Sequence, residues 1–355
     1  MLNKDITADI SAKAAVVMDV NSNRVLLSKN SNIRLPMAST TKIMTALVAI
    51  ESGNLNESVK VSHNAAFMDG SSIYLKEGES IKLEELLYGL MMHSGNDAAV
   101  AIAEHIGGSI SGFAERMNAK AMEIGAYNTH FDNPHGLDSS SHYTTAYDLA
   151  LITSYALKNP KFAEIVRTKR KTIAGPDDES WNRVLTNKNK MLWNFNGGDG
   201  VKTGYTRRAG RCLVSSASRN NWQLVSVVLN CGPMWADSST ILNQCFNQYN
   251  NYSIIQTNKS NTYKEVLVKG GKKMFVSVRP SQNYTLPLTQ DELSQVTITP
   301  VIKSPALAPI KKGTKAGDLN IYLGRARIGT VALEFCEDIQ TSNPIYYIRK
   351  AILGF

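Results

Sequence analysis

Strand-like segments lie near both ends of residues 1–255 and enclose a helical stretch. Residues 14–20 and 24–28 flank the turn Asn21-Ser22-Asn23, a pattern that predicts two antiparallel strands. Residues 211–218 and 223–229 predict a β-hairpin around Arg219-Asn220-Asn221. We therefore expect one α/β (α+β) domain in which strands from the two ends share a sheet.

Helical patterns fill the middle of this region. Ile43, Leu47 and Ile50 have the spacing of one buried helical face, and Gly53 is a typical stop. Residues 84–92, 97–106 and 113–124 show similar patterns, and residues 238–249 predict a helix beside the hairpin. The expected sheet is thus flanked by helices.

The chain changes character after about Asn250. Short β-rich runs between residues 262 and 339 are separated by glycine and proline turns, which predicts a small all-β domain. We expect a first domain over 1–255, a β-sandwich over 256–342 and the start of an amphipathic helix over 343–355. That helix has Ile345, Ile348, Ile352 and Phe355 at helical spacing. It either packs on its own protein or lies on a membrane surface.

The composition excludes some classes of protein. Hydrophobic residues make up 43% of the chain and charged residues 19%, so a sizeable core can form. The net charge of +9 suits acidic wall polymers or anionic lipid, or serves solubility alone. A basic-aromatic nucleic-acid motif is absent from the sequence, so nucleic acid is not an expected partner. The four cysteines lack C-x-x-C spacing, and we expect neither a metal nor a cofactor. Whether Cys212 and Cys231 form a disulfide stays open.

The sequence also limits the options for location. It contains no uncharged apolar run near the ~20 residues of a membrane-spanning helix, and residues 1–19 lack the pattern of a signal peptide. Two interpretations fit: a cytoplasmic protein, or an exported protein from which a leader has been removed.

The segment Ser39-Thr40-Thr41-Lys42 begins the first helical pattern. A spacing of three places the Ser39 hydroxyl and the Lys42 amine on one face, so the amine can take the serine proton. Backbone N–H groups near a helix N-terminus suit a developing oxyanion. The alternative is a helix cap followed by a solvated lysine.

Two further short motifs carry polar side chains. Ser94-Gly95-Asn96 lies between two helical patterns, where both side chains can project into a cleft or Asn96 can simply begin a helix. Lys202-Thr203-Gly204 precedes the strand at 211. It predicts a strand against which an extended substrate can lie with its carboxylate held, or a strand start with an exposed cation.

The order S-x-x-K, S-x-N, K-T-G along one chain is the set found in penicillin-binding proteins and related β-lactamases. The surrounding residues 36–46, 93–99, 135–138 and 201–206 resemble the low-molecular-mass serine D-alanyl-D-alanine carboxypeptidases. The resemblance extends from about Ala14 to Tyr249 and more loosely into the β-rich region. It implies a penicillin-binding/class A β-lactamase-like domain with an antiparallel sheet, followed by a small β-sandwich and an amphipathic anchor.

The resemblance implies a role for each matching residue. Ser39 is then the acylated nucleophile, Lys42 its base, and Ser94 the relay of a proton to the leaving amine. Asn96 holds the substrate carbonyl and orients Lys42. The other implied roles are carboxylate binding by Lys202 and Thr203 in the Lys202-Thr203-Gly204 strand and an oxyanion hole from the backbone N–H groups of Ser39 and Tyr205. We interpret His135 and Asp138 as residues that fix a loop, because a catalytic triad is unnecessary when Lys42 is the base. Arg207 and Arg208 depart from the smaller residues expected after this motif.

We expect an exported enzyme on the outer face of the cytoplasmic membrane that removes the terminal D-alanine from peptidoglycan pentapeptides and is trapped by β-lactams. The alternatives are a class A-like β-lactamase and a catalytically idle wall-binding protein. The β-lactamase is disfavoured because the E-x-x-x-N pattern that supplies its deacylating carboxylate is missing between Ser94 and Lys202. The idle protein is disfavoured because every reactive side chain is present.

Overall fold

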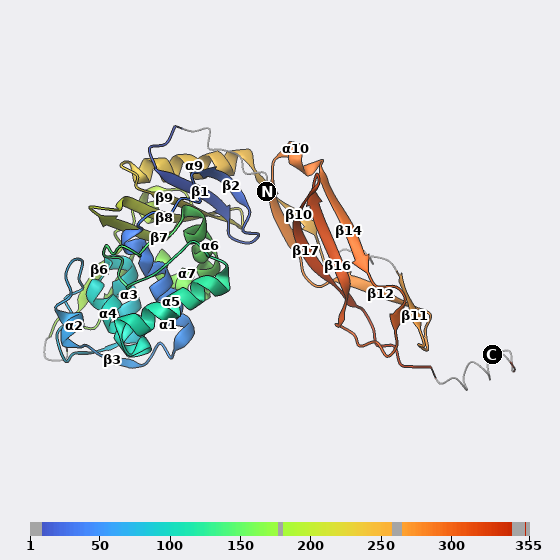
Figure 1. Cartoon of the computed structure of the whole chain (residues 1–355), viewed down its shortest axis with the longest axis horizontal. Coiled ribbons are helices and arrows are strands. Elements are labelled where there is room, and N and C mark those ends of the chain that lie inside the picture. Colours follow the sequence, from blue (N-terminus) through green and yellow to red (C-terminus); the bar gives the residue numbers. More distant parts are fainter. Residues whose placement is uncertain (1–8, 177–179, 258–264, 343–351, 353–355) are drawn as a thin grey trace. The chain divides into compact units, whose positions relative to one another are not determined.

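The computed structural model describes residues 9–176, 180–257, 265–342 and 352 (Figure 1). The chain divides into two compact units, Leu2–Asn247 and Gln248–Phe355. Each unit has its own hydrophobic core, and each is described by itself.

The first unit contains a five-stranded antiparallel sheet in the order β2-β1-β9-β8-β7. Its strands are β1 (Ala14–Asp19), β2 (Val25–Lys29), β7 (Gly198–Thr206), β8 (Gly210–Arg219) and β9 (Trp222–Leu229). Strand β1 is apolar along most of its length and fully buried, because it lies between β2 and β9. The prediction that strands from both ends of this region share a sheet is confirmed.

Helices cover both faces of this sheet (Figure 1). Helix α9 (Met234–Gln248) lies on one face, where Phe246 packs edge-on against Trp222 of β9. Helix α6 (Ala146–Leu157) packs against β1 and β9 on the other face. The remaining long helices, α1 (Lys42–Ser52), α4 (Asn96–Gly107), α5 (Ile110–Ile124) and α7 (Pro160–Arg167), gather on the side of α6. The expected antiparallel sheet flanked by helices is therefore present.

Short elements connect these helices. They are η1 (Ala38–Thr41), β3 (Ser58–Lys60), α2 (His63–Ala66), β4 (Ser80–Lys82), α3 (Leu83–Tyr88), η2 (Gly89–His93), β5 (Arg170–Ile173), β6 (Arg183–Thr186) and α8 (Met191–Asn194). The pattern at 84–92, expected as one helix, is α3 followed by the single π-helical turn η2.

The second unit is built from strands, with one short helix among its described residues. Its six-stranded sheet has the order β14-β16-β17-β12-β11-β15, and β10 pairs with β13. The prediction that this region forms an all-β domain is confirmed. The bounds are β10 (Asn250–Ile255), β11 (Glu265–Lys269), β12 (Phe275–Pro280), β13 (Tyr284–Leu288), α10 (Gln290–Leu293), β14 (Val296–Ile302), β15 (Ala306–Leu307), β16 (Lys315–Leu323) and β17 (Ala326–Phe335).

The predicted amphipathic helix over 343–355 lies outside the described residues, except for Ile352. Among the helices of the described part, none has the length and apolar character needed to cross a bilayer.

Candidate active site

Ser39 lies in the 3₁₀ turn η1, and Lys42 is the first residue of α1. The nucleophile candidate therefore precedes the α-helix instead of lying in its first turn. Residues three apart eclipse in a 3₁₀ turn, so the predicted pair still meets, with Lys42 Nζ 3.0 Å from Ser39 Oγ.

The Lys42 amine is buried among acceptors. Its Nζ donates to Asn96 Oδ1 and to the backbone oxygen of His135, both at 2.7 Å. Burial lowers the pKa of Lys42 well below its ordinary value, and the charge of nearby Lys202 lowers the pKa further, while Asp97 opposes this. A neutral amine beside a hydroxyl is the arrangement that proton abstraction from Ser39 requires.

Ser94 and Asn96 lie at the junction of η2 and α4. Ser94 has a φ of 65°, a left-handed conformation that is strained for a residue with a side chain, and it ends the π-helical turn. Asn96 begins α4, and its Nδ2 donates to the backbone oxygen of Asp69 at 2.7 Å. This bond fixes the amide so that Oδ1 faces Lys42.

Asp97 organises the segment on the other side of this junction. Its carboxylate accepts bonds from the backbone N–H groups of Ile73 and Leu75 and from the Ser72 hydroxyl. The backbone oxygen of Ser71 accepts from Asn96 N–H at 2.6 Å. These bonds hold Ser71 at the cleft beside Ser94, a position that the sequence motifs did not indicate.

Strand β7 carries the third motif past the nucleophile turn. A Cβ on Gly204 would lie 3.0 Å from the backbone nitrogen of Ser39 and 3.1 Å from the backbone oxygen of Met37, so glycine permits this close approach. Thr203 faces the cleft, whereas the Lys202 side chain is buried and donates to the Thr203 backbone oxygen at 2.9 Å. Burial and the charge of Lys188 lower the pKa of Lys202 to about 7.

The loop over residues 132–142 supports the nucleophile turn from behind. The backbone N–H of Asp132 donates to His142 Nδ1, so the neutral ring carries its proton on Nε2, 2.8 Å from Thr41 Oγ1. Thr41 in turn donates to the backbone oxygen of Ala38 at 2.8 Å. Burial lowers the pKa of His142 to about 4, which keeps the ring neutral.

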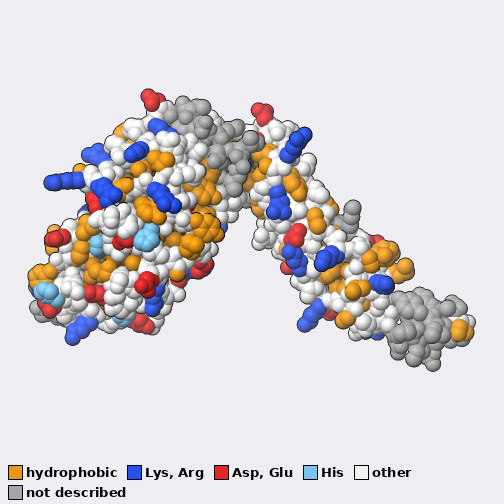
Figure 2. Space-filling view, viewed as in Figure 1, with side chains coloured by type: hydrophobic (Ala, Val, Ile, Leu, Met, Phe, Trp, Pro, Cys, Tyr) orange, Lys and Arg blue, Asp and Glu red, His pale blue; other side chains and the backbone are white. Residues whose placement is uncertain are grey.

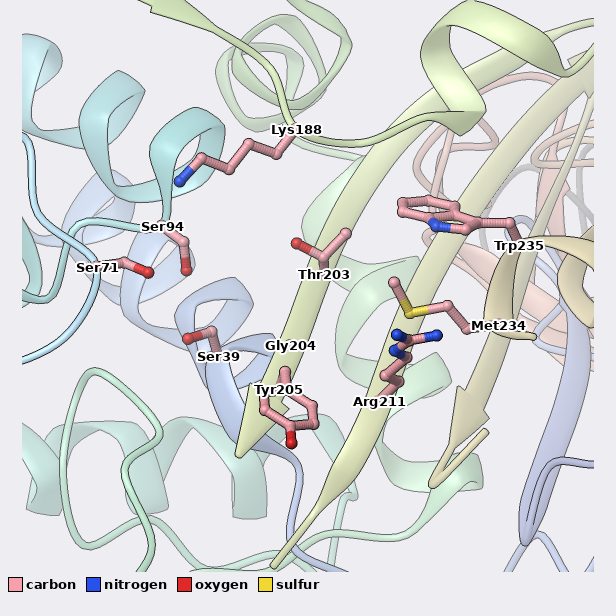
Figure 3. Close-up of a pocket in the computed structure, with 10 residues that line it drawn as sticks. All are labelled: Ser39, Ser71, Ser94, Lys188, Thr203, Gly204, Tyr205, Arg211, Met234 and Trp235. Atoms are coloured by element: carbon pink, nitrogen blue, oxygen red, sulfur yellow. The ribbon is translucent and has the colours of Figure 1, made fainter. Parts of the chain in front are cut away.

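These elements enclose a cleft of about 380 Å³. In Figure 3 the Ser39 and Ser94 hydroxyls lie on one side of it and Thr203 lies on the facing strand. Tyr205 lines the cleft with an exposed side chain, while Asn96 and Lys202 stand behind its wall. The structure thus brings the predicted residues Ser39, Lys42, Ser94 and Asn96 together with strand β7 around this cleft.

Two cations at the cleft were not predicted. Lys188 extends toward Ser94 and donates to the backbone oxygen of His93, 3.2 Å away. Arg211 on β8 lies directly across from Tyr205 and donates to the backbone oxygen of Gly232 at 3.0 Å. Recognition of a β7–β8 hairpin would have placed Arg211 opposite Tyr205 and so near the cleft. No sequence pattern indicates that Lys188 lies at the cleft.

The remaining sequence predictions concern loops and cysteines. His135 contributes its backbone oxygen to Lys42, and Asp138 accepts a bond from Thr206. Of the two unexpected arginines, Arg208 donates to the Ser139 backbone oxygen. All four cysteines are free thiols. Within the described residues, no cluster of His, Cys, Asp and Glu is suited to hold a metal ion.

Comparison with known proteins agrees with this geometry. Residues 2–232 match the Peptidase S11 family, D-alanyl-D-alanine carboxypeptidase, and residues 249–341 match the C-terminal domain of penicillin-binding protein 5. The chain belongs to the Peptidase S11 family. The predictions of a low-molecular-mass penicillin-binding protein and of a serine carboxypeptidase are confirmed.

Individual Peptidase S11 relatives resemble the chain over most of its length. It is 34% identical to D-alanyl-D-alanine carboxypeptidase DacF of Bacillus subtilis over 352 residues, which cover 96% of this chain and 89% of the relative. Penicillin-binding protein 5 of Haemophilus influenzae has a TM-score of 0.79 at 29% identity, covering 94% and 98% of the two chains. The crystal structure of a D-alanyl-D-alanine carboxypeptidase from Mycobacterium tuberculosis has a TM-score of 0.64 at 32% identity and covers 68% of this chain and 92% of its own.

Proposed function

We propose that Ser39 and Lys42 carry out the acylation step of a D-alanyl-D-alanine carboxypeptidase that acts on peptidoglycan pentapeptides. The observation that carries the assignment is the buried Lys42 amine, 3.0 Å from Ser39 Oγ. Two N–H groups of a neutral amine are taken by Asn96 Oδ1 and the His135 backbone oxygen, so its lone pair is left for the Ser39 proton.

Acylation then proceeds in balanced steps. Ser39 Oγ attacks the carbonyl carbon of the penultimate D-alanine, and its proton passes to Lys42. The C–N bond to the terminal D-alanine breaks, and Ser94 relays a proton to the leaving amine. Water hydrolyses the resulting ester, which returns Ser39 and releases the shortened peptide. A β-lactam forms the same ester but keeps its leaving group tethered, so the acyl-enzyme persists.

The substrate carbonyl and the substrate carboxylate need different partners. The backbone N–H groups of Ser39 and Tyr205 supply the oxyanion hole, which the close approach of Gly204 to η1 makes possible. Asn96 holds the carbonyl of the peptide. Thr203 and the buried Lys202 bind the terminal carboxylate, and Arg211 adds an exposed guanidinium at the mouth of the cleft.

The domain assignment and the location belong to the same proposal. Residues 1–255 hold the catalytic machinery, 256–342 form a β-sandwich and 343–355 begin an anchor, so that the enzyme works outside the cytoplasmic membrane. Strand β10 (Asn250–Ile255) pairs with β13, so truncations before and after β10 test the boundary that we propose at residue 255. The apolar spacing at 345–355 predicts weak, salt-sensitive binding to anionic vesicles that is lost when residues from Ile345 onward are deleted.

One experiment separates the three candidate functions. D-Alanine release from a pentapeptide is measured beside hydrolysis of a chromogenic cephalosporin. We expect steady release of D-alanine and a single slow turnover of the cephalosporin. Fast cephalosporin turnover without D-alanine release would identify a β-lactamase, and neither reaction would identify an idle binding protein.

A further inference from the structure

One end of the second unit exposes large hydrophobic side chains. Among the described residues of this unit up to residue 342, the large hydrophobic residues with exposed side chains are Leu267, Met274, Phe275, Val301 and Leu307, and Met274 and Leu307 reach 65% and 70% exposure. Isolated exposed apolar residues are common, but a contiguous group indicates a contact surface.

The strand register places four of these residues together. Leu267 of β11 lies opposite Phe275 of β12, and Met274 immediately precedes Phe275. On the other side of β11, Lys269 lies beside Leu307 of β15. The inward residues of β11, Val266 and Val268, already fill the core, so β11 carries apolar side chains on both faces.

Lysines are frequent in the segments that carry or follow these apolar residues. The segments 265–274, 303–312 and 336–342 contain six lysines and three acidic residues. Lys273 pairs with Glu337, and Lys272 donates to Gln340, while the backbone nitrogen of Lys312 bonds to Asp338. Figure 2 shows basic and hydrophobic side chains close together at this end of the unit. The six lysines are Lys269, Lys272, Lys273, Lys303, Lys311 and Lys312.

The mixture of apolar and cationic groups identifies the kind of partner. Aromatic and aliphatic side chains bordered by lysines suit the boundary between the headgroups and acyl chains of an anionic bilayer. A second copy of the chain would bring lysines against lysines, so self-association through this surface is disfavoured. The backbone nitrogen of Ser342 bonds to the Gly270 oxygen at 2.9 Å, so the segment after residue 342 starts at this same end.

We propose that this end of the folded β unit, defined by Leu267, Met274, Phe275, Leu307 and the six lysines, is itself a docking surface for anionic lipid. The surface acts in addition to any helix in residues 343–355, and it rests on the proposed location at a membrane. It predicts which end of the second unit faces the lipid, because the apolar side chains and the lysines are at that end.

Co-sedimentation with vesicles tests the proposal on the full-length chain. Phosphatidylcholine vesicles are compared with vesicles that also contain phosphatidylglycerol. The test variant combines Lys269→Glu and Lys312→Glu. The matched control combines Arg325→Glu and Arg327→Glu, an equal change of charge at the β16–β17 turn, which lies at the other end of the sheet.

We expect the test variant to weaken binding to the anionic vesicles by about ten-fold or more at low salt, because each cation near the surface contributes to binding. The control should change binding by less than about three-fold. Met274→Ser should also weaken binding, whereas Met122→Ser, a similarly exposed methionine on α5, should not. Equal losses in test and control variants would overturn the proposal.

Two further measurements keep the result interpretable. D-Alanine release in the same samples reports on the proposed function, so a loss of vesicle binding with full activity concerns the docking surface alone. If the first variant does not fold, Lys303→Glu with Lys311→Glu makes the same charge change in the β14–β16 connection. A dimer in sedimentation velocity that Phe275→Ser abolishes would assign the surface to a second copy and overturn the lipid assignment.

Discussion

Replacing Ser39 removes the hydroxyl that Lys42 can activate. We expect Ser39→Ala to abolish covalent labelling by a fluorescent penicillin while the circular dichroism spectrum stays unchanged, because the side chain is small and only half buried. Ser71→Ala is the matched control, since Ser71 lines the same cleft but lies outside the Lys42 contacts. Persistent labelling of Ser39→Ala would show that another residue is acylated.

Carboxylate recognition can be assigned with a pair of substrates. Amidation of the peptide C-terminus should raise KM of the wild type by on the order of ten-fold or more, the range for a hydrogen bond to a charged group. Amidation should raise the KM of Arg211→Ala and of Lys202→Ala much less, because each variant has already lost part of the interaction with the carboxylate. Arg208→Ala serves as the control. If the effects of amidation and of each substitution on KM are additive in free energy, neither cation binds the carboxylate.

Side chains that belong to short motifs could be predicted, whereas those positioned by tertiary packing could not. Local turns bring Ser39 to Lys42 and place Ser94 near Asn96, but the contact between Lys42 and Asn96, which are 54 residues apart, depends on the packing of α1 against α4. Lys188 reaches the cleft only through the packing of a loop against η2. The burial of Lys202 depends on the tertiary packing around β7. The sequence therefore predicted the Lys202-Thr203-Gly204 motif but not the burial of the lysine.

At the scale of elements, the loop over 132–142 should make the first unit sensitive to acid. The pKa of His142 is lowered to about 4, so on acidification the unfolded chain takes up this proton before the folded chain does. From about pH 7 to about pH 5 this residue should lower the free energy of unfolding by about 2 kcal/mol. Urea unfolding at both pH values measures the loss.

The matched variant for this measurement is His142→Gln. It should be less stable than the wild type at neutral pH, because the bonds to Asp132 and Thr41 are weakened. Its stability should nevertheless depend less on pH. A variant with the same pH dependence as the wild type would exclude His142 as the source.

Apolar spacing predicted the long helices α1, α4, α5 and α9, whereas α6 and α7 were not predicted, and one predicted helix is interrupted for a local reason. The pattern over 84–92 is continuous in hydrophobicity, but the chain leaves the α-helix at Gly89 for a π-helical turn that ends in the left-handed Ser94. Hydrophobic spacing does not report such a turn, because its apolar residues stay buried on the same side.

At the scale of the whole molecule, the two units should be separable. A chain ending at Tyr249, before β10, should keep penicillin labelling, because every described group at the cleft comes from residues before 236. A chain ending at Ile255 carries β10 without its partner β13 and should aggregate more readily. Labelling and light scattering of both chains test this. Loss of labelling in the shorter chain would show that the second unit completes the catalytic one.

The division into an α/β region and an all-β region could be predicted because the two patterns have different periods. The strand orders could not, since they depend on pairings between residues far apart, such as β1 with β9. The domain boundary at residue 255 stays a prediction that the two truncated chains can test.

Strand β7 is the last strand of its sheet, and the turn that carries Ser39 lies beside it. In the described part of the chain, β7 is therefore an edge strand, and its unpaired edge is on the side of the cleft. A peptide bound in an extended conformation, as we propose, would supply a further strand along β7 for one turnover. We therefore expect the cleft to select for a backbone that can extend along β7 and exchange hydrogen bonds with it.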